Sequence, residues 1–159
     1  SKVTDERKGM RYLAEALAQM DSSRLHLVVV GRDAQSVASL CPGIAFTALG
    51  SVTPDEMPMV YAAADVFVTP SLEDNLPNTI AEAMSVGTPC VGFRTGGIPE
   101  MITHLTSGYV AEQCNAADLA CGIGYVLCHP LREAAARQAA RDYNEGRVAE
   151  RYISIYESL

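Results

Sequence analysis

Residues 66–93, which read VFVTPSLEDNLPNTIAEAMSVGTPCVGF, decide the fold of this chain. The apolar runs at residues 66–69 and 90–93 have the length and composition of short buried strands. A polar loop follows the first run, and then a helix that begins at residue 78 or 79 and stops before Gly87. Strand, polar loop and helix start form the arrangement in which α/β proteins bind ligands, because the free N–H groups of the first helical turn point at the loop.

The same alternation of strands and helices extends from this stretch to both ends of the chain. Strands are expected at residues 25–30, 44–49, 66–69, 90–93 and 109–111. Helices are expected at residues 9–20, 34–40, 53–64, 78–86, 99–102, 115–128, 130–143 and 147–158. Such an order forms an open parallel sheet through right-handed crossovers. We therefore predict an α/β fold: a doubly wound, Rossmann-like parallel sheet with helices on both faces.

Three local patterns refine this prediction. The strand at residues 25–30 is nearly continuous in apolar residues, which is typical of a parallel strand covered on both faces. Residues 53–56, Thr-Pro-Asp-Glu, form a capping box that starts a helix. Asn115 with Asp118 is expected to cap the helix at residues 115–128.

Size and composition indicate a single globular domain, residues 1–159. The 159 residues are 48% hydrophobic and 19% charged, which excludes a disordered chain and is enough for a core of its own. A net charge of −7 argues against a nucleic-acid partner, which would require a basic face. No apolar run has the length of a membrane span, and residues 1–6 do not resemble a signal peptide.

The cysteines are five in number: Cys41, Cys90, Cys114, Cys121 and Cys128. They contain no CxxC pair, and their spacing suits neither a zinc site nor a disulfide framework. The last three recur every seven residues and would share one side of a helix. We predict that they are buried as small hydrophobic residues and that the protein resides in a reducing cytoplasm.

Cations are scarce around the central loop. Between Asp33 and Leu131 one cation, Arg94, stands against ten acidic residues. The beginning of the chain is richer in cations, with Lys2, Arg7, Lys8 and Arg11. If the loop binds a phosphate through side-chain cations, most of these must come from the N-terminal cluster, folded back onto the loop.

Two common nucleotide-binding patterns are absent. Residues 31–36, Gly-Arg-Asp-Ala-Gln-Ser, follow the first expected strand and do not match GxGxxG, and the chain has no GxxxxGK[ST] loop. These absences argue against an NAD-dependent enzyme and against a P-loop NTPase.

Several short motifs follow one another along the chain. They are Arg7-Lys8-Gly9, Ala64-Asp65-Val66-Phe67-Val68, Pro70-Ser71, Asp74, Glu82-Ala83-Met84, Gly87-Thr88-Pro89, Gly96-Gly97-Ile98-Pro99-Glu100 and Val148-Ala149 with Arg151-Tyr152. In this order they resemble the C-terminal, donor-binding domain of retaining glycosyltransferases of the GT-B fold and the GT4 (group 1) type. The resemblance covers essentially the whole chain and implies one half of a GT-B architecture.

The resemblance implies roles for two acids separated by seven residues. Asp74, where the family usually has glutamate, would contact the donor sugar, and Glu82 would bind the ribose hydroxyls. A carboxylate suits both tasks because it accepts two hydrogen bonds at once. Taken alone, Asp74 fits a solvated turn residue and Glu82 an exposed helix acid better than a binding site, and the surrounding motifs reverse this preference.

The loop and the helix start between these acids would face the sugar and the phosphates. The residues concerned are Asn75, Leu76, Asn78 and Thr79. Pro77 lacks an N–H group that a glycine often supplies in this family. The Asp-Asn-Leu-Pro-Asn run at residues 74–78 resembles bacterial polysaccharide transferases by analogy.

By the same resemblance Lys8, next to Arg7, binds the diphosphate, and the family's companion arginine would fall at about Lys2. The residues near the base would be Gly31, Ser51 and Val52. Gly96-Gly97 is either a substrate-facing loop or only a tight turn. No metal and no other cofactor is implied, because cationic side chains and helix ends replace a metal in this fold.

A GT-B enzyme has two such domains with the active site between them. The resemblance therefore implies a nucleotide-sugar donor for residues 1–159 and a missing N-terminal domain with the acceptor site and a catalytic histidine. The isolated half would bind the donor without transferring it. The full-length enzyme would make polysaccharide or glycolipid in the cytoplasm, and any contact with the inner face of a membrane would involve the other domain. Two alternatives stay open, a GT-B-fold nucleotide-sugar 2-epimerase and a non-catalytic nucleotide-sugar-binding module.

Overall fold

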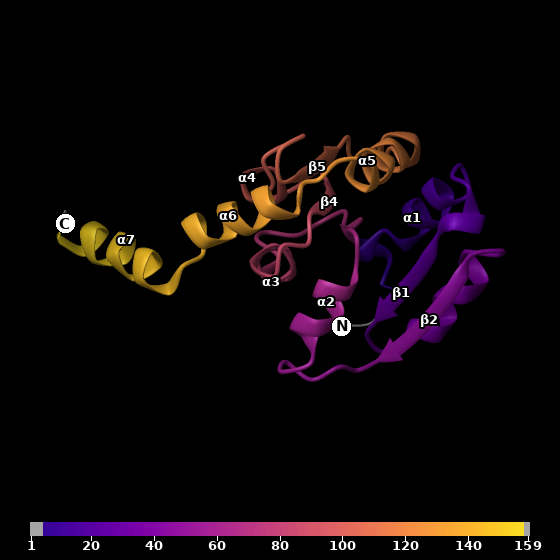
Figure 1. Ribbon diagram of the computed structural model, residues 1–159, viewed down its shortest axis with the longest axis horizontal. Coiled ribbons are helices and arrows are strands. Elements are labelled where there is room, and N and C mark those ends of the chain that lie inside the picture. The colour runs from indigo at the N-terminus through magenta and orange to yellow at the C-terminus, as the bar shows by residue number, and fades with distance from the viewer. Residues whose placement is uncertain (1–4, 158–159) are drawn as a thin grey trace.

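The computed structural model describes residues 5–157, in which strands and helices alternate in the predicted order (Figure 1). The strands are β1 (His26–Val30), β2 (Ala45–Gly50), β3 (Phe67–Thr69), β4 (Cys90–Phe93) and β5 (Gly108–Ala111). The α-helices are α1 (Met10–Leu17), α2 (Met57–Ala63), α3 (Asn78–Ser85), α4 (Ile98–Met101), α5 (Ala116–Cys128), α6 (Arg132–Asp142) and α7 (Glu145–Glu157). Three segments are 3-10 helices: η1 (Glu6–Lys8), η2 (Ser22–Arg24) and η3 (Ala34–Leu40).

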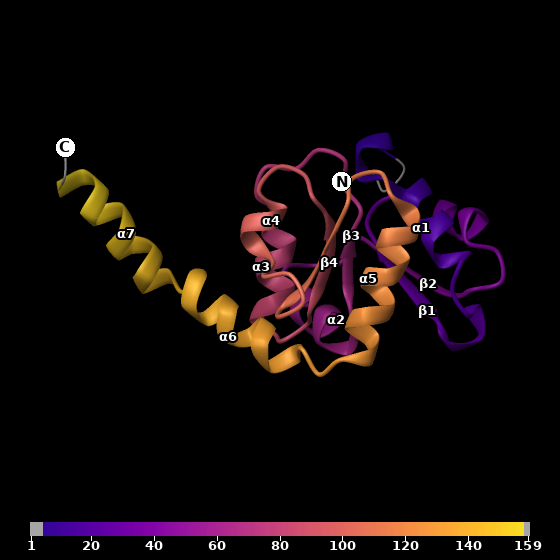
Figure 2. The ribbon, with the colours of Figure 1, turned by 90° about the horizontal axis from the view of Figure 1, so that it is seen from above.

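Helices cover both faces of the strands (Figure 2). One buried cluster joins α1, η3 and α5 to Val91 and Phe93 of β4. A second cluster joins α2, α3, α4 and α6 to Cys90 on the opposite face of the same strand. Because successive side chains of a strand point to opposite faces, β4 contributes to both clusters and is buried throughout. The predicted fold class, α/β with helices on both faces, is confirmed.

The strands form two hydrogen-bonded ladders where one continuous sheet was expected. β1 pairs in parallel with β2, and β3, β4 and β5 pair in parallel in that order. The prediction that the first strand is covered on both faces is wrong for Val28, which is 45% exposed. Val29 packs into the cluster with α1 and η3, whereas Val28 points to the opposite, open face of β1.

The two helix-start signals had different outcomes. The side chain of Asn115 accepts a hydrogen bond from Asp118 N–H at 3.0 Å, so the predicted cap of α5 is confirmed. At residues 53–56 the Glu56 carboxylate accepts from both the N–H and the hydroxyl of Thr53, at 3.1 and 2.7 Å. The threonine hydroxyl thus donates and does not cap an N–H group, and regular α2 begins only at Met57.

The burial predicted for three cysteines is wrong. Cys114, Cys121 and Cys128 are exposed, and Cys114 lies before α5 with a positive φ of 59°. The residues that fill the core from α5 are its large aliphatic ones, so the seven-residue spacing of the thiols marks the outer side of this helix. Cys41 and Cys90 are buried as small hydrophobic residues.

The last helix, α7, extends away from the domain and packs chiefly against α6 (Figures 1 and 2). Its exposed hydrophobic residues are Tyr152, Ile153, Ile155 and Tyr156. The helix predicted at residues 147–158 is confirmed, with an earlier start at Glu145, and residue 158 lies outside the described residues. Across residues 5–157, no helix combines the length and the apolar character needed to cross a membrane.

Candidate functional site

The N-terminal turn folds back onto the loop that follows β3, as the distribution of cations predicted. Leu72 N–H donates to Arg7 O at 2.8 Å. Gly9, with φ +63°, lies so close to this loop that a Cβ atom would stand 1.9 Å from Pro70 O. Only glycine fits such an approach, so the Arg7-Lys8-Gly9 motif explains how two distant segments touch.

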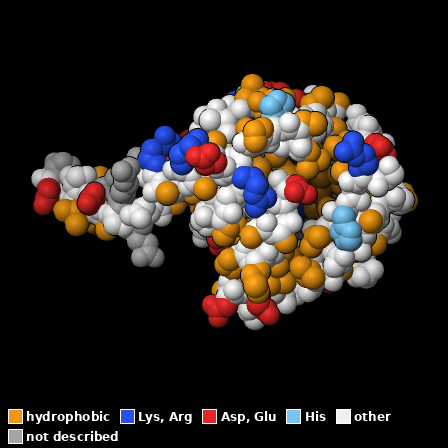
Figure 3. Space-filling model, viewed as in Figure 1, with side chains coloured by type: hydrophobic (Ala, Val, Ile, Leu, Met, Phe, Trp, Pro, Cys, Tyr) orange, Lys and Arg blue, Asp and Glu red, His pale blue; other side chains and the backbone are white. Residues whose placement is uncertain are grey.

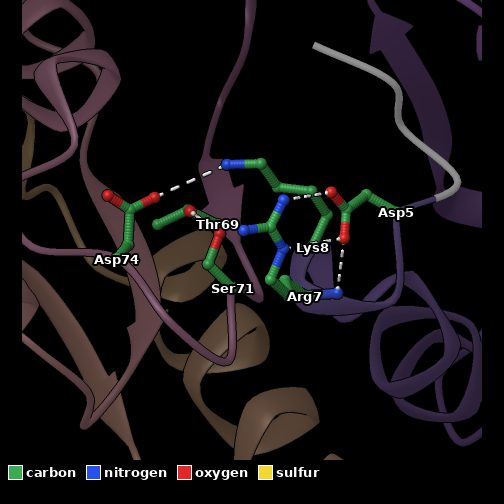
Figure 4. Close-up of polar contacts among 6 residues, drawn as sticks. All are labelled: Asp5, Arg7, Lys8, Thr69, Ser71 and Asp74. Carbon is green, nitrogen blue, oxygen red and sulfur yellow. Dashed lines mark hydrogen bonds and ion pairs between the residues drawn. The ribbon is translucent and has the colours of Figure 1, made fainter.

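The contact brings two predicted site residues together (Figure 4). Lys8 Nζ lies 3.5 Å from Asp74 Oδ2, and the side chains stay 39% and 21% exposed, so a ligand could reach both. Arg7 instead points at Asp5, whose carboxylate it contacts at 2.7 Å. Hydrogen bonds from Arg7 lower the pKa of Asp5 to about 2. Lys8 is therefore the cation of this turn that faces the central loop.

Hydrogen bonds from polar side chains hold the loop after β3 in place. Leu72 O accepts from Thr95 Oγ1 and from Gln113 Nε2, each at 2.9 Å. Ser71 is 2% exposed, and its hydroxyl lies 3.4 Å from that of Thr69. Sequence reasoning missed Thr95 and Gln113. The position of Thr95 directly before Gly96-Gly97 was the one available signal, and nothing in the sequence marks Gln113.

Gly96 and Gly97 pack closely against the backbone of the same loop. A Cβ atom on Gly96, with φ +50°, would stand 1.7 Å from Asp74 O, and one on Gly97 would stand 2.1 Å from Asn75 O. Gly97 N–H also donates to Asn75 O at 2.6 Å. The two glycines therefore form a tight turn against which the loop rests, and a contact with substrate remains a prediction.

The helix start behind the loop leaves N–H groups available. The first hydrogen bond of α3 runs from Ile80 N–H to Pro77 O at 2.9 Å, and within residues 5–157 no side chain caps the helix. The N–H groups of Asn78 and Thr79 precede that bond. The predicted ligand-facing residues of this stretch are all exposed: Asn75, Leu76, Asn78 and Thr79.

Glu82 lies further along α3 and has a different partner. Tyr61, in α2, donates its hydroxyl to Glu82 Oε2 at 3.0 Å. Tyr61 is 4% exposed and packs edge-to-face on Phe67, with ring centroids 5.3 Å apart. Burial, and secondly the Glu82 carboxylate, raise the pKa of Tyr61. Among residues 5–157, no hydrogen bond or ion pair joins Glu82 to Lys8 or Asp74.

Gly31, Ser51 and Val52 lie at the carboxyl ends of β1 and β2. Gly31 N–H donates to Gly50 O at 2.6 Å, so the two strand ends are side by side. In the described part of the chain, no hydrogen bond links them to the other candidate residues. Residues 5–157 also contain no group of three or more His, Cys, Asp or Glu side chains placed to hold a metal ion.

A sequence profile of the family described as "Glycosyl transferases group 1" matches residues 1–129. The chain belongs to this family. Sulfoquinovosyl transferase SQD2 of Arabidopsis thaliana is 30% identical over 112 residues, which are 70% of this chain and 22% of that protein. The 2-deoxystreptamine glucosyltransferase of Streptomyces kanamyceticus is 29% identical over 144 residues, 86% of this chain and 37% of that one.

Two solved structures of longer chains share the fold. Sucrose-phosphate synthase of Thermosynechococcus elongatus superposes with a TM-score of 0.83 and 25% identity, over 97% of this chain and 43% of that chain. Anabaena Alr3699/HepE, solved in complex with UDP, gives 0.84 with 21% identity, over 100% of this chain and 47% of that chain. This group 1 chain therefore spans less than half the length of the proteins that it matches.

Proposed function

We propose that residues 1–159 are the donor-binding half of a retaining glycosyltransferase and hold the diphosphate of a nucleotide sugar beside Lys8. The approach of Lys8 Nζ to Asp74 Oδ2, 3.5 Å across two loops distant in sequence, carries this proposal. The ammonium group donates to phosphate oxygens, and the carboxylate beside it accepts from sugar hydroxyls. A glycosyl diphosphate carries these two chemistries next to each other.

The start of α3 supplies the second half of the phosphate site. The N–H groups of Asn78 and Thr79 and the positive end of the helix favour a negative charge at this point. No metal ion is part of the proposal, since Lys8 and the helix start provide the positive potential.

The nucleoside would lie toward α2 and the ends of β1 and β2. In the proposal Glu82 binds the ribose hydroxyls, and the base rests near Gly31, Ser51 and Val52. The solved Anabaena neighbour is described in complex with UDP and with UDP-glucose, which supports a nucleotide sugar as the class of donor.

The whole protein, in this proposal, transfers the glycosyl group in a cleft between this domain and an N-terminal domain that holds the acceptor. The 43–47% coverage of the solved neighbours supports a second half of similar size. We assign the enzyme to cytoplasmic synthesis of polysaccharide or glycolipid, with any membrane contact made by the other half. The relatives' names include a sulfoquinovosyl transferase and a 2-deoxystreptamine glucosyltransferase, so the products in this family are diverse.

A calorimetric titration of the domain with UDP, GDP and ADP sugars tests donor binding. One of the three is expected to bind, and Lys8→Met should weaken that binding about tenfold or more, as the loss of a charge-assisted contact implies. Arg137→Met removes one exposed cation from α6 and serves as the matched control, with unchanged affinity. No binding of any of these sugars at millimolar concentration would contradict the proposal.

Product analysis of the full-length protein tests the reaction. Transfer to an acceptor with retained anomeric configuration, seen by NMR, supports the proposal, and Glu82→Ala and Lys8→Ala should each reduce the rate more than about tenfold. Conversion of the nucleotide sugar into its epimer without an acceptor would establish the epimerase instead. Donor binding with no turnover of any kind would establish the non-catalytic module.

A further inference from the structure

Leu72, in the loop after β3, has all the hydrogen-bonding positions of its backbone in use. Its N–H group donates to Arg7 O at 2.8 Å, in the turn that carries Lys8. Its carbonyl oxygen accepts from Thr95 Oγ1 and from Gln113 Nε2, each at 2.9 Å. A carbonyl oxygen has two lone pairs, so these two donors complete it. The N-terminal turn and the loops after β3, β4 and β5 therefore meet at this residue.

The turn that carries Gln113 is held in place by α5. Glu112 N–H donates to Asp118 Oδ2 at 2.7 Å, and Tyr109 donates its hydroxyl to the other oxygen of this carboxylate at 2.8 Å. Asn115 N–H donates to Glu112 O at 3.1 Å and closes the turn around Gln113. The backbone of this turn is thus anchored to β5 and to α5, and the Gln113 amide reaches the loop after β3 from a fixed position.

Thr95 is anchored at the end of β4. Arg94 N–H, next to it, donates to Ala111 O at the end of β5, at 2.7 Å. Gln113 Nε2 lies 3.5 Å from Thr95 Oγ1, so the two side chains and Leu72 O form one small polar cluster. The loops after β4 and β5 thus hold the loop after β3 through its carbonyl oxygen, and the N-terminal turn holds it through its N–H group.

The position of Leu72 affects both side chains of the candidate diphosphate site. Lys8 is the residue after Arg7 in the N-terminal turn. Asp74 lies two residues after Leu72, and its Oδ2 is 3.5 Å from Lys8 Nζ (Figure 4). Without the donors at its carbonyl oxygen, Leu72 would keep one of its three hydrogen bonds, and the loop would be free to carry Asp74 away from Lys8.

We infer that Gln113 and Thr95 are positioning residues for the diphosphate of the donor, which hold Lys8 and Asp74 next to each other through Leu72 O. This inference rests on the proposed function, because it requires a nucleotide sugar beside Lys8. Both side chains act through one backbone carbonyl of the loop and need no contact with the donor. In the proposed function other residues bind the nucleoside, so the effect of Gln113 and Thr95 should be confined to the diphosphate and the sugar.

Calorimetric titration of the full-length protein with a nucleotide sugar and with the matching nucleoside monophosphate tests the inference. The probes are UDP-, GDP- and ADP-glucose, paired with UMP, GMP and AMP. Gln113→Leu should weaken binding of the nucleotide sugar about three- to tenfold, as the loss of one hydrogen bond implies, and leave binding of the monophosphate unchanged. Unchanged affinity for the nucleotide sugar, or an equal loss for both ligands, would overturn the inference alone. If none of the three sugars binds the wild-type protein, the proposed function fails, and the inference fails with it.

Two substitutions of Thr95 separate the hydrogen bond from the packing of the side chain. Thr95→Val keeps the shape of the side chain and loses the hydroxyl, so it should weaken nucleotide-sugar binding about three- to tenfold. Thr95→Ser keeps the donor and should keep the wild-type affinity. Equal affinity of the two variants would overturn the role of the Thr95 hydroxyl.

Gln138, in α6, provides the matched control. Its amide donates to Met101 O at 3.0 Å, so it also joins two segments distant in sequence through a backbone carbonyl. Charged side chains lie over α6 in Figure 3, whereas Gln138 is on the inner side of this helix and 7% exposed. Within residues 5–157 its side chain has no hydrogen bond to the loop after β3.

Gln138→Leu should lower Tm and leave the affinity for the nucleotide sugar unchanged, because it removes a hydrogen bond that holds the fold and not the loop. A loss of affinity as large as that of Gln113→Leu would mean that reduced stability alone weakens binding, and it would overturn the positioning role.

Discussion

At the scale of single residues, the orientation of Glu82 depends on Tyr61. The Tyr61 side chain is buried, and two further contacts hold the residue in place. Its ring packs on Phe67, and its backbone carbonyl accepts a hydrogen bond from the Thr88 hydroxyl at 2.6 Å. A carboxylate hydrogen-bonded to so rigid a donor keeps its other oxygen free for a ligand. Tyr61 is thus a positioning residue for the proposed ribose contact.

Tyr61→Phe is expected to weaken nucleotide binding about threefold or more, since it removes one hydrogen bond to a charged group and leaves the aromatic packing in place. KM for the donor should rise more than kcat falls, which steady-state kinetics of the full-length enzyme would measure. Tyr125→Phe loses a hydroxyl bonded to Leu105 O and is the control, with unchanged affinity. Equal affinity of both variants and the wild type would refute the positioning role.

Gly96→Ala should separate Asp74 from Lys8. The added methyl group would overlap Asp74 O, so the loop must move, and we expect a loss of about 1–3 kcal/mol of stability together with most of the nucleotide affinity. Gly43 is the control, because its φ is also positive, +82°, but a Cβ atom there would have no neighbour within 4 Å. Gly43→Ala should cost only about 1–2 kcal/mol of backbone strain and leave nucleotide binding intact. Urea denaturation and calorimetry on both variants measure the difference.

At the scale of elements, α5 carries two glycines in different surroundings, and one of them, Gly122, packs on Tyr109 of β5. A Cβ atom on Gly122 would stand 2.5 Å from the Tyr109 ring, whereas one on Gly124 would meet nothing within 4 Å. Gly122→Ala should therefore destabilise the fold by about 1–3 kcal/mol. Gly124→Ala should stabilise it by about 0.5–1 kcal/mol, because alanine is the better helix former. Thermal unfolding of the two variants should show Tm shifts of opposite sign.

The same junction predicts a pH dependence. A hydrogen bond from Tyr109 to the Asp118 carboxylate, with burial adding to it, raises the pKa of Tyr109 from its ordinary 10.0 to about 12. The folded state favours the protonated phenol, so its contribution to stability is complete below pH 10 and is lost as the pH rises from 10 to 12. Urea denaturation across this range should show the loss, and Tyr109→Phe should reduce its slope, while the raised pKa values of Tyr61 and Tyr143 keep part of the dependence. An equal slope in both proteins would contradict the assignment.

Hydrophobic periodicity and cap residues were enough to predict the order of the elements. Periodicity cannot report which side of a helix is covered, and this explains the error for Cys121 and Cys128, which lie on the outer side of α5. The scarcity of cations correctly predicted that the N-terminal turn folds back. The contacts of Thr95 and Gln113 with the loop span 23 and 41 residues of sequence, and no local pattern encodes them.

At the scale of the whole molecule, α7 contributes little to the domain. It packs chiefly against α6 and exposes several large hydrophobic side chains. Ending the chain at Asn144 should therefore shift Tm by no more than about 2 °C, because little buried surface is lost. The shortened chain should also self-associate less, which light scattering at matched concentrations would show. A large fall in Tm would mean that α7 stabilises the domain.

The packing of the loop after β3 on three glycines also has a consequence for protein engineering. Backbone atoms of the loop rest directly on Gly9, Gly96 and Gly97, so a side chain at any of these three positions must displace the loop. Glu73 and Leu76, in contrast, are exposed positions of the loop. A combinatorial library aimed at a new donor sugar should therefore randomise the outward positions and keep the glycines constant. Most of its members should then retain the fold, and screening effort would fall on recognition instead of on misfolded variants.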